Sequence, residues 1–393
     1  MQPLTDSGSD HPMGSERSPA PQRLAWLDRA KAYGMFLVYY GHFVETITYL
    51  QGFSVEIAAF SQYKFIYAFH MPLFFILSGF FDKAKEQKIS SFLTRGFLTR
   101  ILPAIFFNLI AILILLLQDL AFRDSSYYDH PSIEKLLLAL LTGRPLANFI
   151  TWFLFCLFTV ECLNYIVRPL IKANLWKRGG LAMMTLIVGY FMGLNEDTLQ
   201  GLSIRGQNFW YFTETLIGFS FYQFGFILKQ SGFISLVQAS FYKYIGLGLT
   251  FLLTVLLFDL NQGPFTDARE LVLMASVSHG NLIFFGLTAI TGSLWVIFLA
   301  LCLPSSRVIT FIGQNTLILL GLNFLFTDFT QPIVEAIGLS AFESWWSVLL
   351  LCTALTLSSF AVAIPAIKLL HRFIPQLVGK PKTAGPILPA LLH

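Results

Sequence analysis

The chain has few charged residues for its length. Only 12% of its 393 residues are Asp, Glu, Lys or Arg, whereas soluble domains carry about 25%. Hydrophobic residues make up 55%, Phe alone occurs 41 times, and the mean hydropathy is +0.66. This composition indicates a polytopic membrane protein rather than a soluble enzyme.

Several functional motifs are also missing from the sequence. It contains no Gly-rich nucleotide-binding loop, no HExxH, no Cys/His cluster and no GxSxG. The four cysteines lie in apolar segments without metal-ligand or disulfide spacing, so we expect reduced packing residues. We therefore predict no metal site, and nothing in the sequence supports binding of nucleic acid.

Hydrophobic segments predict an all-α transmembrane domain over residues 23–375. Residues 1–22 are rich in Ser, Pro, Asp and Gly and are typical of a disordered cytoplasmic tail. Residues 376–393 are predicted as a cytoplasmic C-terminal tail. Ten apolar segments are long enough for a hydrocarbon core of ~30 Å, the fifth only marginally. They cover about 30–50, 59–81, 97–118, 148–170, 181–194, 208–228, 244–260, 275–303, 307–328 and 345–370. The run 271–303 is long for one helix, so its start can lie outside the bilayer.

The distribution of positive charge predicts the orientation. With ten spans and a cytoplasmic N-terminus, 20 of the 26 Lys and Arg residues fall on the cytoplasmic side. The six on the opposite side are Lys64, Arg123, Lys135, Arg144, Arg205 and Arg269. This asymmetry follows the positive-inside rule and places both termini in the cytoplasm.

The first apolar segment carries a polar stripe. Lys31 and His42 are eleven residues apart, so on a helix they share a face to within about 20° and lie roughly 16 Å apart. Asp28 and Glu45 fall near the same line. Because polar groups are costly in lipid, this face must meet protein or water. His42 can be a general base, an acyl carrier or a structural link between helices, and Lys31 can bind an anion or extend to the interface.

The second segment contains a predicted irregularity. Pro72 frees a backbone carbonyl within the membrane, and Ser78-Gly79 allows another backbone to approach closely. Non-helical backbone at that depth requires protein or a cavity beside it. His70, on the outer half of the segment, can contact an external substrate or serve as an interface residue.

Further charged residues occupy the third and fourth segments. Arg95 can determine topology or bind phosphate, and Arg100, just before Pro103, is the better phosphate ligand because it lies deeper. Glu161 is in the middle of its segment and must be protonated or paired. Polar residues of the ninth segment, Asn315 and Asn323 among them, can line a cavity or pair helices.

Together these residues resemble the membrane acyltransferase-3 superfamily, and more closely its branch of fucose 4-O-acetylase-like sugar O-acetyltransferases. The matching motifs are Leu27-Asp28-x-x-Lys31-x10-His42, Phe69-His70-Met71-Pro72-Leu73-Phe74-Phe75-x-x-Ser78-Gly79, Arg100-x-x-Pro103, Trp152-Phe153-Leu154-x3-Phe158-x2-Glu161 and Ile312-Gly313-x-Asn315-Thr316-Leu317. The resemblance implies ten core helices, acyl-CoA as donor, and transfer of acetyl or another acyl group to a glycan hydroxyl.

Two positions depart from the family pattern. Lys31 stands where much of the superfamily has arginine, although the sugar-acetylase branch often has lysine there. Asn323 stands where the late motif usually ends in histidine, and asparagine cannot shuttle protons at neutral pH.

The resemblance implies the following roles. The catalytic residues are His42, with Asp28 positioning Lys31 and with Glu161 or Glu45 orienting the imidazole. Acetyl-CoA binds near Lys31, Arg95 and Arg100, with Ser78 lining its cavity. The substrate-binding residues are His70, Trp152, Asn315 and Asn323.

These roles describe an acetyl-CoA-dependent O-acetyltransferase in the bacterial cytoplasmic (inner) membrane. Its acceptor is a cell-envelope or exported glycan, or a lipid-linked saccharide. Two alternatives stay open: a transporter or flippase for a lipid-linked sugar, and a catalytically inactive relative, which Asn323 suggests.

Overall fold

The computed structural model describes residues 24–53, 57–82, 87–121, 131–172, 174–195, 203–204, 207–266 and 269–392. The predicted N-terminal tail, residues 1–22, lies outside these ranges. The regular secondary structure of the described chain is helical apart from one antiparallel pair of two-residue strands, β1 (Ser203–Ile204) and β2 (Gln207–Asn208), and one isolated bridge between Leu273 and Ser278. The prediction of an all-α protein is confirmed.

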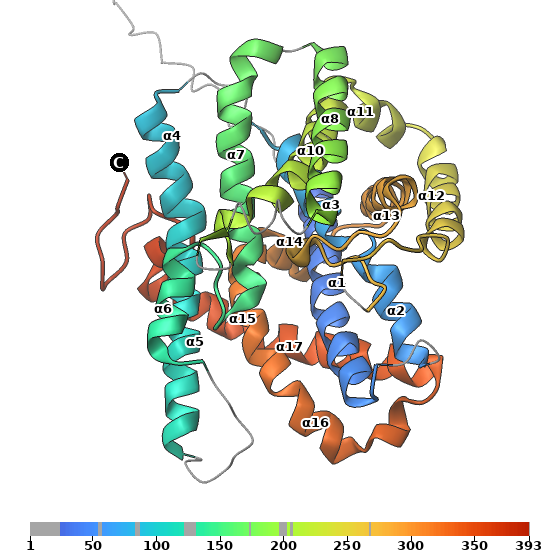
Figure 1. Ribbon diagram of the computed structural model, residues 1–393. Coiled ribbons are helices and arrows are strands. Elements are labelled where there is room, and N and C mark those ends of the chain that lie inside the picture. The colour runs from blue at the N-terminus through green and yellow to red at the C-terminus, as the bar shows by residue number, and fades with distance from the viewer. Residues whose placement is uncertain are drawn as a thin grey trace, which may run out of the picture.

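Figure 1 shows how the helices are arranged. In chain order they are α1 (Ala25–Leu50), α2 (Ala58–Tyr67), α3 (His70–Phe80), α4 (Ile89–Gly96), η1 (Phe97–Ile101), α5 (Leu102–Ala121), α6 (Ile133–Leu141), η2 (Phe149–Thr151), α7 (Trp152–Ile171), α8 (Leu175–Leu194), η3 (Phe209–Tyr211), α10 (Phe212–Gln230), α11 (Phe233–Gln238), α12 (Tyr242–Phe258), η4 (Met274–Ser276), α13 (Leu282–Cys302), α14 (Arg307–Gln314), α15 (Thr316–Asp328), α16 (Thr330–Ile337), η5 (Leu339–Phe342), α17 (Trp345–Phe373) and η6 (Pro375–Val378). Each of the ten apolar segments overlaps one helix or a pair of consecutive helices. The run 271–303 becomes a helix only at Leu282.

Five helical stretches within the described ranges are long and apolar enough to cross a membrane. They are Ala58–Phe80, Ile89–Gln118, Phe149–Ile171, Leu282–Cys302 and Trp345–Phe373. A sixth is counted if α14 and α15, which meet at 85°, form one broken span. Figure 1 shows α13 almost along its axis while α5, α7 and α8 run from top to bottom, so the helices are not a simple parallel bundle. Ten crossings therefore stay a prediction.

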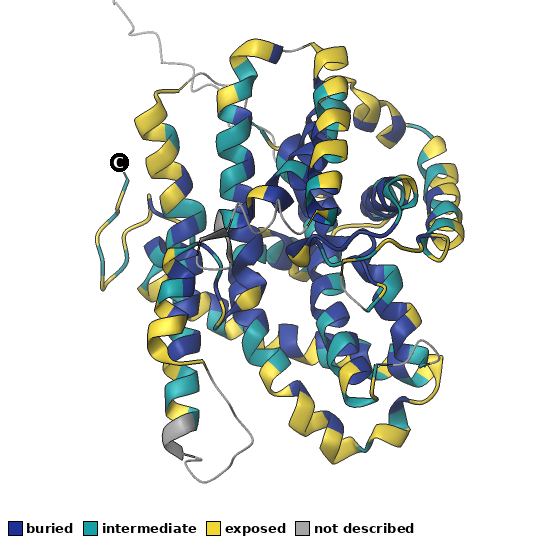
Figure 2. Ribbon diagram, in the orientation of Figure 1, coloured by how far each residue is buried: buried dark blue, intermediate teal, exposed yellow. Residues whose placement is uncertain are grey.

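Helix α1 lies at the centre of the fold. It packs against α2, α3, α13, α14, α15 and α17. Figure 2 shows buried residues concentrated in α1 and α3, whereas exposed residues dominate α8, α12 and α16 on the outside. Many exposed residues of α12 and α17 are large and apolar, for example Leu252, Leu256, Leu350 and Leu357. An apolar outer surface around a central helix with charged residues is what a lipid environment requires.

Helices α3 and α10 approach each other backbone to backbone through two glycines. A Cβ atom on Gly79 would lie 1.8 Å from the carbonyl oxygen of Tyr222, and one on Gly225 would lie 1.9 Å from that of Ile76. Small residues allow this kind of close contact between membrane helices. The predicted close approach at Ser78-Gly79 is confirmed.

We predict that Gly225→Ala destabilises the protein by about 1–3 kcal/mol, because the methyl group has no room against backbone atoms that cannot rotate away. The measurement is the thermal unfolding midpoint of the purified protein in detergent. Gly248→Ala in α12 is the matched control, since no atom lies within 4 Å of the position of its Cβ. A midpoint for Gly225→Ala equal to that of the control would contradict the close contact.

Candidate active site

The polar stripe on α1 lines three adjoining cavities. The first, the basic cavity, has a volume of about 410 Å³ and includes Lys31, Ser78 and Arg100 in its wall. The second, the apolar neck, has about 140 Å³ and shares these three residues. The third, the histidine cavity, has about 490 Å³. The neck and the histidine cavity share Val38, Met71 and Leu320.

The path therefore follows one face of α1. Lys31, Met35, Val38 and His42 succeed one another at helical spacing and line the three cavities in turn. The predicted common face of Lys31 and His42 is confirmed. Apart from Lys31 and Arg100 at one end, the wall of the neck is mostly apolar: Met35, Val38, Met71, Phe74, Leu77, Phe153, Leu154, Leu157, Leu317 and Leu320.

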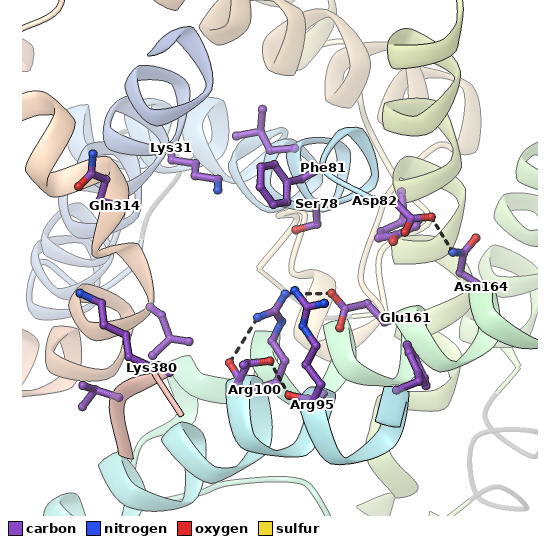
Figure 3. Close-up of a pocket in the computed structure, with 18 of the residues that line it drawn as sticks. Lys31, Ser78, Phe81, Asp82, Arg95, Arg100, Glu161, Asn164, Gln314 and Lys380 are labelled. Carbon is purple, nitrogen blue, oxygen red and sulfur yellow. Dashed lines mark hydrogen bonds and ion pairs between the residues drawn. The ribbon is translucent and has the colours of Figure 1, made fainter. Parts of the chain in front are cut away.

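The basic cavity carries an excess of positive charge. Its described lining holds five Lys or Arg residues (Lys31, Arg95, Arg100, Arg168 and Lys380) and two carboxylates, Asp82 and Glu161. In Figure 3, Lys31 points into the space from α1, while Arg95 and Arg100 reach it from α4 and η1. Asp82 accepts a hydrogen bond from Asn164 at 3.1 Å on the opposite wall from Lys380. Such a lining favours an anionic ligand with several charges.

Arg100 is held by a local irregularity that Pro103 explains in part. Residues Phe97–Ile101 form a π-turn between α4 and α5, a feature frequent at functional sites. Pro103 has no amide hydrogen to donate to the carbonyl of Thr99, and this carbonyl accepts a hydrogen bond from Nη1 of Arg100 at 3.3 Å. Nη2 donates to Oε1 of Glu161 at 3.0 Å. Nε is buried and has no hydrogen-bond partner among the described residues.

Glu161 therefore belongs to the basic cavity. We expected Glu161 to be protonated or paired in the middle of its segment, and the structure pairs it with Arg100. Of the two carboxylates suggested to orient the imidazole of His42, Glu45 is hydrogen-bonded to it, whereas Glu161 does not line the histidine cavity.

In the histidine cavity, Glu45 anchors the imidazole. Nδ1 of His42 lies 2.8 Å from Oε2 of Glu45. The same carboxylate accepts hydrogen bonds of 2.8 Å from the hydroxyls of Tyr63 and Tyr67. In the tautomer with its proton on Nδ1, the imidazole donates to this carboxylate. Nε2 then carries a lone pair, as a base or nucleophile must.

His70 and Trp152 line the same cavity. The helix breaks between α2 and α3, where Phe69 has φ −144°, as the predicted irregularity at Pro72 requires. Nδ1 of His70 donates to the carbonyl of Ile66 at 3.0 Å, which leaves Nε2 as an acceptor. Arg269 also lines the cavity and lies 4.9 Å from the ring centroid of Tyr49.

The remaining predicted residues are spread over the structure. Ser78 and Arg95 line the basic cavity, as expected for the donor side. Asn315, grouped by sequence with His70 and Trp152, lines the basic cavity instead, because the chain bends at this residue between α14 and α15. Buried Asp28 accepts a hydrogen bond of 3.4 Å from Gln314 and so links α1 to α14.

Asn323 is fully buried in α15. Neither its Oδ1 nor its Nδ2 has a hydrogen-bond partner in the described part of the chain. It lines none of the three cavities. Its side chain therefore lies behind the wall of the path rather than in it.

Several residues that line the cavities were not predicted from the sequence. Arg168 follows Glu161 by seven residues, a spacing that puts both on one face of α7 and could have indicated it. Tyr67, Arg269 and Lys380 carried no such signal, because their contribution depends on how distant segments fold together.

A carboxylate-anchored histidine connected to a cation-rich cavity suits transfer of a group from an anionic donor to an acceptor. With its apolar helices, the protein is of the class of membrane-embedded transferases. A family model described as an acyltransferase domain matches residues 24–364, and the chain belongs to this acyltransferase-3 superfamily. No match was found among curated proteins or among solved structures.

This membership makes the protein a multi-pass membrane acyltransferase. It favours the enzyme over the transporter or flippase considered from the sequence.

We predict that diethyl pyrocarbonate modifies His42 faster than His70 or His279. His42 is partly exposed in the histidine cavity, whereas His70 and His279 are buried. Peptide mapping by mass spectrometry after limited modification measures the relative rates. Equal rates at His42 and His279 would show that the imidazole of His42 is not accessible from the cavity.

Proposed function

We propose that the protein is an O-acyltransferase that moves an acyl group, most simply acetyl, from acyl-CoA to a hydroxyl of a cell-envelope or exported glycan. The acceptor can still be linked to lipid. The observation that carries this proposal is the series of adjoining cavities from five clustered cations to the His42–Glu45 pair. The sugar O-acetyltransferase branch resembled by the sequence motifs supports the same acceptor class.

The basic cavity fits the nucleotide end of CoA. Its five cations match the phosphates of the nucleotide in charge. Lys31 and Arg100 line both this cavity and the neck, so they hold the phosphates at the entrance of the path. The apolar wall of the neck suits the long arm that carries the thioester, and bound acyl-CoA supplies the activated acyl group.

His42 then handles the proton. Its Nε2 accepts the proton of the acceptor hydroxyl while the hydroxyl oxygen bonds to the acyl carbon and the carbon–sulfur bond breaks. The departing thiolate receives this proton from the imidazolium, which restores neutral His42. Glu45 stabilises the imidazolium through Nδ1. If His42 carries the acyl group instead, the same Nε2 is the nucleophile.

The distribution of cations supports entry of the donor from the cytoplasm. All five cations of the basic cavity belong to the set that the positive-inside rule assigns to that side. Arg269, in the histidine cavity, belongs to the six on the opposite side. The acceptor accordingly binds from the outer face of the bacterial inner membrane, near His70 and Trp152. The Trp152 ring offers a surface for a sugar, and Nε2 of His70 accepts a hydrogen bond from one of its hydroxyls.

We predict that His42→Ala lowers glycan acetylation by about 10²-fold or more, the usual contribution of a general base. The variant is expressed in a strain lacking the native protein, and acetyl groups on the glycan are measured by NMR. Binding of CoA to the purified variant is the control and should be unchanged, because His42 does not line the basic cavity. Full acetylation by His42→Ala would refute its role.

We also predict that Glu45→Gln lowers turnover by about 10²-fold. The amide has one oxygen for three donors, Nδ1–H of His42 and the hydroxyls of Tyr63 and Tyr67, and it cannot balance the charge of an imidazolium. Release of free CoA from acetyl-CoA in the presence of acceptor measures the effect. Glu335→Gln is the matched control, because Glu335 is exposed on α16 and contacts Gln331 only four residues away. Equal turnover for the two variants would exclude Glu45 from the reaction.

A further inference from the structure

The chain after α17 folds back onto the helical domain. We name residues 375–392 the C-terminal hook. The amide of Lys380 donates to the carbonyl of Pro375 at 3.0 Å, and the amide of Leu391 donates to that of Pro381 at 2.8 Å. The side-chain amide of Gln376 donates to the carbonyl of Leu388. Gln376 and Val378 are buried, so the predicted tail is an integral part of the folded domain.

The hook forms part of the wall of the basic cavity. Val378, Gly379 and Lys380 line it, and η6 packs against η1 and α5. Gly379 has φ +87°, and a Cβ atom there would lie 3.2 Å from the side chain of Leu317 and 3.9 Å from the carbonyl oxygen of Thr99. The turn therefore fits between α15 and η1, beside the segment that carries Arg100. All of the hook lies beyond residue 364, where the match to the acyltransferase family ends.

Lys380 is held at the cavity by a second residue. Its Nζ lies 3.3 Å from Nδ1 of His371 in the last turn of α17, and His371 also lines the cavity. An ammonium group has only donors, so this imidazole nitrogen accepts the hydrogen bond. In Figure 3, Lys380 lies on the same side of the cavity as Gln314, opposite Asp82 and Asn164. Unlike Lys31 and Arg100, it does not line the neck.

We infer that Lys380, presented by the hook and held by His371, binds a phosphate of the donor nucleotide. This inference rests on the proposed function. Because Lys31 and Arg100 occupy the end of the cavity that leads into the neck, they meet the phosphates next to the thioester arm. Lys380 lines the basic cavity but not the neck, so it meets a phosphate of the nucleotide further from the thioester. The hook thus completes the donor site with a residue from outside the matched family domain.

The test measures equilibrium binding of CoA to the full-length protein in detergent by calorimetry. Lys380→Gln should weaken CoA binding about tenfold, as loss of one charge-assisted contact to phosphate predicts. Binding of 3′,5′-ADP should weaken equally, whereas binding of pantetheine, which has no phosphate, should not change. Lys380→Arg should restore most of the affinity. Lys382→Gln is the matched control, because Lys382 is exposed on the same hook and does not line the cavity.

The outcomes separate the two proposals. Absence of CoA binding to the unmodified protein would overturn the proposed function and this inference with it. If the unmodified protein binds CoA and Lys380→Gln binds it equally well, only the role of Lys380 is refuted. An equal loss in Lys382→Gln, or an equal loss for pantetheine, would also refute it, because the effect would then come from general charge or from disruption of the hook.

Discussion

The position of ionisable groups on one face of the central helix α1 is the constraint on which the rest of the structure depends. Lys31, His42 and Glu45 occupy a central helix whose surroundings are apolar, where unpaired charge is costly. Glu45 is compensated by three hydrogen bonds from His42, Tyr63 and Tyr67. Lys31 faces a polar cavity. The broken helix α2–α3 and the bend between α14 and α15 surround this face and leave a path along it.

The part of the site that lies on one helix could be predicted from the sequence. An interval of eleven residues fixes the relative directions of Lys31 and His42 once a helix is assumed, and the structure places them along one series of cavities. The choice between Glu45 and Glu161 as the partner of His42 could not be made in this way. It depends on the position of α7 relative to α1, and Arg100 on η1 decides it by pairing with Glu161.

Other features arise from contacts between distant segments and had no local signal. In the sequence, Asn315 is a polar residue in an apolar stretch. In the structure, the 85° bend between α14 and α15 places it in the lining of the basic cavity. Residues 375–392 contain several Pro and Gly residues and no apolar periodicity, so the sequence predicts a tail. Their order comes from hydrogen bonds such as that of Gln376 with Leu388 and from packing on η1. The predicted ten membrane crossings likewise exceed the five or six that helix length and apolarity establish among the described residues.

The apolar neck has a consequence for the membrane as an electrical barrier. A path from one face of a bilayer to the other would conduct protons and other ions if water filled it throughout, and it would dissipate the membrane potential. Hydrophobic constrictions prevent this by excluding water. Between the charged basic cavity and the His42–Glu45 pair stand Met35, Val38, Met71, Phe74 and Leu320, around a space of only about 140 Å³. The same residues that suit the thioester arm of the proposed donor therefore also exclude water from the path between turnovers.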